Sequence, residues 1–145
     1  MPRRTVDYVA LADLRHHLRR FLQVREERAR HLGVPPQQYM ALLQLKALQA
    51  RPPATIGALA DRLLVRHHTA VGLVDRLAER GMARRRRMGG DRRAVTVELT
   101  AKGERTLHRL AVHSMVELST DGPALVSVLS RLLSRARKPR KGGRR

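Results

Sequence analysis

The chain has 145 residues, of which 42% are hydrophobic and only 2% are aromatic, and it contains no cysteine. Its formal net charge is +19, from 31 Lys and Arg against 12 Asp and Glu. These values exclude disulfides and thiolate metal sites, and they predict a single α-rich domain that meets a polyanion, most often nucleic acid.

No apolar run approaches the length of about 18 residues that a membrane helix needs, and no signal-peptide pattern stands at the N-terminus. A role at a membrane surface would need a basic amphipathic helix with large apolar residues on its other face, and none stands out. We therefore expect a cytoplasmic protein with no membrane partner.

The first part of the chain predicts two helices. Residues 6 to about 32 read as one long helix, which Gly33 and then Pro35 and Pro36 end. Its apolar seam is Leu11, Leu14, Leu18, Phe21 and Leu22. A small domain cannot bury so long a helix alone, so we expect it to pack in a dimer; packing wholly within its own chain is the alternative. A second helix is expected from residue 36 to about residue 48, and a loop with Pro52 and Pro53 leads to Thr55.

Residues 55–80 predict two short helices that are separated by a polar corner. Thr55 is the expected N-cap of the first, whose apolar positions are Ile56, Leu59, Ala60 and Leu63. The second, from about residue 67 to residue 80, has an apolar stripe at Ala70, Leu73, Val74 and Leu77, and Gly81 follows where a left-handed residue is wanted. Thr69, Gly72 and Arg76 face away from this stripe, as the outward side of a recognition helix must.

A basic hairpin is expected after Gly81, because the hydrophobic period changes to two. Residues 84–87 precede the turn signal at 88–91, and Val95, Val97 and Leu99 alternate with polar residues as in a half-buried strand. Six arginines surround the tip of this hairpin, at positions 84, 85, 86, 87, 92 and 93, with Asp91 to offset them.

The last part of the chain predicts two more helices and a tail. Thr100 is expected to cap a helix over residues 101–118, with an apolar stripe at Leu107, Leu110, Ala111 and Met115. The sequence at 119–123, with Gly122 and Pro123, is expected to break it before a last helix at 124–134. Residues 135–145 hold seven basic residues, and we expect a disordered tail that either aids solubility or binds phosphates.

In this order and at these spacings, residues 55–103 resemble the winged helix-turn-helix of the multiple antibiotic resistance regulator (MarR) family. The matching residues are Leu59 and Ala60, the run at 73–77, Arg80 and Gly81, and a wing pattern of Asp91, Arg93, Leu99, Thr100 and Gly103. The resemblance implies a fold that is mainly α with a small β-wing. It also implies a winged helix-turn-helix DNA-binding domain at 36–100 with N- and C-terminal dimerisation helices at 6–33 and 101–134.

The residues expected to bind DNA lie on the second short helix and on the hairpin. Arg76 suits guanine O6 and N7 or a phosphate, and the resemblance places DNA contacts at this position and at Thr69. Arg93 matches the wing arginine of the family and suits a narrow A·T-rich minor groove, with Asp91 as its brace. The whole expected set is Arg66, His67, His68, Thr69, Gly72, Arg76, Arg84, Arg86, Arg92 and Arg93.

Other interpretations remain for these residues. His67, His68 and Gly72 depart from the small polar, lysine or larger polar residues that are common in the family, and the bare Gly72 either lets the helix sit deep or loses a contact. A zinc site at the two histidines is disfavoured, because neighbours on a helix point to different sides and no third ligand is apparent. The alternative for residues 84–87 is a solvated charged strand, and the alternative for Arg76 is a surface salt bridge.

We expect a homodimeric, sequence-specific transcription regulator that binds a pseudo-palindromic operator in double-stranded DNA, a repressor by family analogy. The resemblance suggests a small aromatic or anionic effector. It also implies that the helices with His16, His17, His108 and His113 flank the family's effector pocket. The alternative is that these are ordinary surface or core histidines. The sequence shows no catalytic constellation, and no cofactor or metal is expected. The rival is a nonspecific architectural nucleic-acid-binding protein, associated with the nucleoid or the ribosome.

Overall fold

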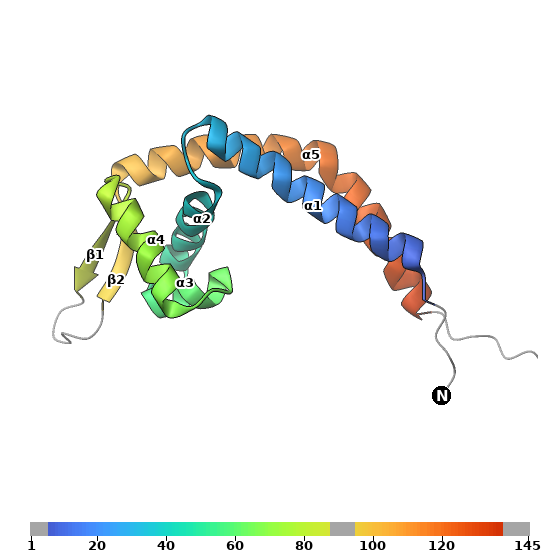
Figure 1. Cartoon of the computed structure of the whole chain (residues 1–145), viewed down its shortest axis with the longest axis horizontal. Coiled ribbons are helices and arrows are strands. Elements are labelled where there is room, and N and C mark those ends of the chain that lie inside the picture. Colours follow the sequence, from blue (N-terminus) through green and yellow to red (C-terminus); the bar gives the residue numbers. More distant parts are fainter. Residues whose placement is uncertain (1–5, 88–94, 138–145) are drawn as a thin grey trace, which may run out of the picture. The chain divides into compact units, whose positions relative to one another are not determined.

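The computed structural model describes residues 6–87 and 95–137, which form five helices and a two-stranded antiparallel sheet (Figure 1). In chain order the elements are α1 (Tyr8–His31), α2 (Pro36–Ala50), α3 (Ile56–Leu63), α4 (His67–Glu79), β1 (Ala83–Arg87), β2 (Val95–Leu99) and α5 (Ala101–Arg137). In the sheet, Arg84 lies opposite Glu98 and Arg86 lies opposite Thr96. This is the mainly α fold with a small β-wing that the sequence predicts.

The chain divides into two compact units. Residues 6–25 and 114–137 make up one unit, and the described residues between 26 and 113 make up the other, which we call the core unit. The core unit is wider than the predicted DNA-binding domain at 36–100. Its buried cluster takes in Ala29 from the end of α1, and Leu107 and Leu110 from the first turns of α5.

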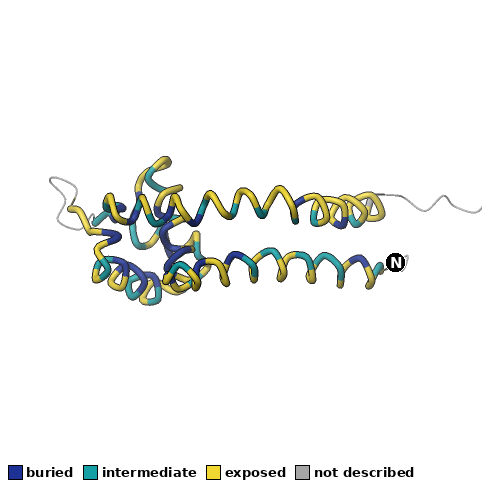
Figure 2. The backbone as a smooth tube through the Cα atoms, turned by 90° about the horizontal axis from the view of Figure 1, so that it is seen from above, coloured by how far each residue is buried: buried dark blue, intermediate teal, exposed yellow. Residues whose placement is uncertain are grey.

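The buried residues of the core unit, dark blue in Figure 2, are almost entirely aliphatic. Leu42 and Leu45 of α2, Leu59 of α3 and Leu77 of α4 are fully buried, and Met82 between α4 and β1 is nearly so. The wing closes this core, because Val97 and Leu99 of β2 are buried in it. Burial of apolar surface therefore holds α4 and the wing together in the core unit.

The ends of the short helices follow the predicted caps. The Thr55 hydroxyl accepts a hydrogen bond from the Ala58 amide at 3.1 Å and so begins α3. Gly81 has φ +69° after α4, as predicted. The corner between α3 and α4 is made by Leu64, which has φ 55° although it is not a glycine, and its side chain is 92% exposed.

The predicted break at residues 119–123 is wrong, because α5 is one helix of 37 residues with Pro123 inside it. Proline removes one backbone donor and crowds the carbonyl one turn earlier. A break would instead leave the last carbonyls of one helix and the first amides of another without partners. The helix therefore continues to Arg137, so residues 135–137 are helical and not part of a disordered tail; residues 138–145 lie outside the described residues.

Many residues of the unit made by 6–25 and 114–137 are exposed (Figure 2). They include several large apolar side chains. Of the predicted seam on α1, Leu14 and Phe21 are half-buried, whereas the other members are 41–49% exposed: Leu11, Leu18 and Leu22. On α5 the exposed apolar side chains are Met115, Val116, Leu118, Val126, Leu129 and Leu133. No helix in the described part of the chain is long and apolar enough to span a membrane.

Candidate nucleic-acid interface

Helix α4 has a buried side and an open side, as its sequence predicts. Its stripe of Ala70, Leu73, Val74 and Leu77 is buried in the core unit. On the open side, His67, His68 and Arg76 are exposed, and Thr69 and Gly72 are half-buried. The predicted division of this helix is thus confirmed, and DNA contact by its open side stays a prediction.

The N-terminus of α4 is open to solvent. Arg66 is the N-cap residue, with extended φ and ψ of −71° and 154°, and its side chain makes no capping hydrogen bond. Its carbonyl accepts from the amides of Thr69 and Ala70 at 3.0 and 3.2 Å. Exposed amides at a helix start attract anions, so a phosphate at this end would meet the backbone together with Arg66 and the two histidines.

Gly72 and Arg76 share one patch on the open side of α4. A Cβ built on Gly72 would lie 4.0 Å from Nη2 of Arg76, with no nearer neighbour. The guanidinium therefore lies along a bare stretch of backbone, one turn from its own Cα. A larger side chain at residue 72 would compete with Arg76 for this space.

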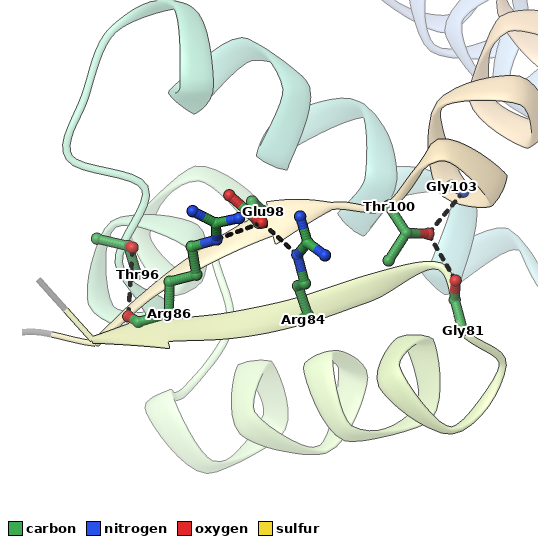
Figure 3. Close-up of polar contacts among 7 residues, drawn as sticks. All are labelled: Gly81, Arg84, Arg86, Thr96, Glu98, Thr100 and Gly103. Carbon is green, nitrogen blue, oxygen red and sulfur yellow. Dashed lines mark hydrogen bonds and ion pairs between the residues drawn. The ribbon is translucent and has the colours of Figure 1, made fainter.

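On one face of the wing, two arginines share a single carboxylate (Figure 3). The Arg84 guanidinium donates to Oε1 of Glu98 across the strand pair, and Nε of Arg86 lies 2.6 Å from the same oxygen. The hydrogen bond from Arg84, together with the charges of both arginines, lowers the pKa of the Glu98 carboxyl from its ordinary value. Since this pKa is depressed, the pairing is complete at neutral pH and is lost only as the pH falls through the lowered pKa.

The other face of the wing is joined to the recognition helix. Ala83 and Val97 are buried on this face, and Arg85 projects from it to Asp75 on α4, with Nη2 and Oδ1 2.5 Å apart. Three of the four consecutive arginines of β1 thus have a carboxylate partner. Neither Glu98 nor Asp75 was expected as a partner from the sequence. For Glu98 the signal would have been the strand register, which pairs residue 84 with residue 98.

The base of the wing is fixed by Thr100 (Figure 3). Its hydroxyl donates to the Gly81 carbonyl at 2.5 Å and accepts from the Gly103 amide at 3.1 Å. A Cβ on Gly103 would overlap the Met82 carbonyl oxygen, closer than real Cβ atoms approach backbone. This close approach explains why a threonine followed three residues later by a glycine occurs at the foot of the wing.

A second set of contacts fixes the C-terminal end of α4. The Arg80 guanidinium donates to Oε1 of the buried Gln38 and to the Gly33 carbonyl, both at 2.8 Å. Nζ of Lys102 donates to the Arg80 carbonyl at 2.7 Å. Arg80 matches the resembled family pattern, and its role here is to anchor the recognition helix to the turn before α2.

The wing is also tied to the start of the helix-turn-helix. The Val97 amide donates to the Ala54 carbonyl at 2.8 Å, and Thr55 forms an isolated antiparallel bridge with Thr96. The loop before α3 therefore acts as a short third partner of the sheet. Sequence reasoning missed this pairing, because a two-residue bridge has no hydrophobic period of its own.

Several predicted residues remain without a structural account. Arg92, Arg93 and the predicted brace Asp91 lie outside the described residues. Of the four histidines considered for an effector, His16 and His113 are exposed, His17 is half-buried, and His108 helps to line an open, shallow depression on α5 with Glu104, Arg105 and Arg109. Over 6–87 and 95–137, no three His, Asp or Glu side chains gather as metal ligands would.

A family model identifies the helix-turn-helix region. Residues 32–94, which contain α2, α3, α4 and β1, match the model described as the MarR family. This segment is similar to the MarR family. The resemblance seen in the sequence at the recognition helix is confirmed. No curated protein matches the chain.

Solved structures of MarR-family proteins share the fold over most of the chain. MepR, a transcription regulator of the Staphylococcus aureus multidrug efflux pump MepA, has a TM-score of 0.73 at 17% identity, over 91% of this chain and 100% of its own. A mutant of MarR from E. coli in complex with operator DNA has a TM-score of 0.63 at 20% identity, over 86% and 90% of the two chains. The PcaV transcriptional regulator from Streptomyces coelicolor, in complex with its natural ligand, has a TM-score of 0.56 at 26% identity, over 85% and 92%. MepR and PcaV are transcription regulators, the class of protein that the sequence predicts.

Proposed function

We propose that the protein is a homodimeric, sequence-specific transcription regulator that represses by binding a pseudo-palindromic operator. In this proposal α4 enters the major groove and the wing lies along the neighbouring backbone and minor groove. Arg66, His67, His68 and Thr69 approach the DNA from the start of the helix, Gly72 and Arg76 from its middle, and Arg84 and Arg86 from the wing, together with Arg92 and Arg93.

The observation that carries the proposal is the open face of α4 on a rigid support. The helix is anchored by Arg80 at its end and is joined to the wing through Asp75 and Arg85. Reading bases requires side chains that are held in a fixed register relative to phosphate contacts. A helix and wing fixed to each other in this way would meet that requirement.

The uncovered apolar surface of the other unit supports the dimer. Large apolar patches are rare on soluble monomers, and two copies could bury these exposed side chains against each other. A two-fold dimer would then present two α4 helices to half-sites about one helical turn apart, which is why a pseudo-palindrome is proposed.

Ligand control is a separate part of the proposal. PcaV was solved with its natural ligand, and by analogy a small aromatic or anionic effector would release this protein from DNA. The residues that would bind it are not assigned.

The test is selection of duplexes from a library of randomised sequence, followed by affinity measurement on the selected and on random DNA. A selected palindromic motif, bound about 10³-fold or more tightly than random DNA by a dimer, is the expected result. The rival, a nonspecific architectural protein, is favoured by the net charge of +19. It predicts that no motif emerges and that all duplexes bind alike.

A further inference from the structure

Glu98 lies in the middle of the most basic part of the described wing, and its position suggests a role in the DNA-binding function proposed above. Its side chain is 28% exposed, whereas those of Arg84 and Arg86 are 57% and 59% exposed. Each arginine uses Nε for the carboxylate, and both contacts are to the same oxygen, Oε1. The outer nitrogens of both guanidinium groups therefore stay available to a phosphate.

We propose that Glu98 is a specificity-determining residue, which positions Arg84 and Arg86 and limits their attraction to the phosphates of any duplex. The inference rests on the proposed function, because it concerns the ratio between operator and random DNA. It does not require Glu98 to touch DNA, so Glu98 is a positioning residue.

The first half of the argument concerns charge. Binding to random DNA comes almost entirely from neutralised phosphates and released counterions, so it follows the cationic charge that the wing presents. The face with Arg84 and Arg86 carries a net charge of +1 with Glu98 and would carry +2 without its carboxylate. A carboxylate in contact with both guanidinium groups repels the same phosphates that they attract. Glu98 thus weakens sequence-independent binding.

The second half concerns geometry. On an operator, α4 fixes the register, and the wing gains most if its arginines already hold the right position. A long arginine side chain loses rotamer entropy when it is ordered. The shared carboxylate holds the guanidinium groups of Arg84 and Arg86 in place before DNA arrives. On an operator, the entropy saved by the ordered arginines offsets the repulsion between Glu98 and the phosphates. On random DNA the wing takes no fixed position, so the ordered arginines bring no such advantage.

The experiment compares Glu98→Gln, which keeps the shape and removes the charge, with the unmodified full-length protein. The probes are a random-sequence duplex and the best duplex that the unmodified protein selects from a randomised library, each titrated over a range of salt concentrations. We expect Glu98→Gln to raise affinity for the random duplex by roughly 3- to 10-fold and to steepen its salt dependence. Affinity for the selected duplex should change by less than about twofold, so that the ratio of the two falls.

Two matched variants isolate the cause. Glu26→Gln removes the same charge from an exposed pair with Arg30 on α1, and it should leave both affinities within about twofold. Glu98→Asp keeps the charge, and it should keep weak binding to the random duplex. Circular dichroism of each variant shows whether the fold is retained.

The outcomes separate this inference from the function on which it rests. If the unmodified protein selects no sequence, the proposed function fails, and the role in specificity fails with it. If it selects a motif but Glu98→Gln behaves like Glu26→Gln, only the role of Glu98 is overturned. An equal gain of Glu98→Gln on both duplexes also overturns it, because the carboxylate would then affect affinity and not specificity.

Discussion

Asp75 on the recognition helix accepts a hydrogen bond from Arg85 on the first wing strand at 2.5 Å, across ten residues of sequence. The pair joins the two elements that would contact DNA on either side of a phosphate backbone. Asp75 and Arg76 are neighbours on α4, so one side chain holds the wing while the next stays free for the groove. A change at Asp75 should therefore alter DNA binding by the wing and α4 together more than it alters the stability of the fold.

The Asp75–Arg85 pair should contribute little to folding, because the two side chains are 50% and 36% exposed. Asp75→Asn should lower the free energy of unfolding by less than about 1 kcal/mol, and Arg85→Gln by a similar amount. Urea denaturation of both variants and of the double variant would measure the coupling. A coupling of several kcal/mol would contradict the view that this pair is solvated.

Gly103 should be intolerant of any side chain. Gly103→Ala places a Cβ against the Met82 carbonyl, where neither backbone can move freely, and should cost on the order of 1–3 kcal/mol of stability. The control is Gly57→Ala on α3, where the nearest atom to the new Cβ is 3.9 Å away. That variant should be neutral or more stable by up to about 1 kcal/mol in the same thermal unfolding assay. Equal behaviour of the two alanines would show that the close approach at Gly103 is not what matters.

Leu64 should be replaceable by glycine with a gain. Its φ of 55° is costly for a residue with a Cβ, and its 92% exposed side chain packs against little that would be lost. After the entropy of a more flexible unfolded chain is subtracted, Leu64→Gly should stabilise the fold by roughly 0.5–1 kcal/mol. Val65→Gly, at the next residue, should instead destabilise it, because Val65 packs on the core. Chemical denaturation measures both, and a loss at residue 64 would be the contrary result.

Arg76 should read DNA sequence, whereas an arginine on α3 should not. Arg76→Ala should weaken the selected duplex by about 1–3 kcal/mol more than random DNA and flatten preference at one or two positions per half-site. The control is Arg62→Ala on α3, which removes the same charge. The guanidinium of Arg62 donates to Gln44 at 2.8 Å. The measurement is the affinity of each variant for duplexes with randomised half-sites, which shows at which positions sequence preference is lost. A uniform loss over all sequences for Arg76→Ala would favour the nonspecific rival.

The exposed apolar surface of α5 should be a dimer interface. Val126 is 63% exposed, and Val126→Glu should shift the protein towards monomer by burying a charge in a dimer. Ala124→Glu, about 160° away around the same helix turn, introduces the same charge on another side and should leave the dimer in place. Sedimentation at micromolar concentration distinguishes the two species. A monomeric unmodified protein would remove the basis for a two-fold operator.

The sequence by itself determined the local structure of this protein. The stripe of α4 at 3.6-residue spacing, the cap at Thr55, the left-handed Gly81 and the alternation of β2 each depend on neighbouring residues, and each is confirmed. The resemblance to the MarR family rests on the same local patterns, which is why it was visible before the structure.

Only the tertiary structure decided which charges meet and where the compact units end. Arg84 and Arg86 meet Glu98 through the register of two strands, and Arg85 meets Asp75 through the packing of β1 on α4. A run of four arginines contains no local signal that distinguishes paired from unpaired members. Likewise, the turn signals at residues 119–123 predicted a break, whereas α5 continues through Pro123. Periodicity reports which face of an element is apolar, whereas partners distant in sequence are chosen by the packing of whole elements.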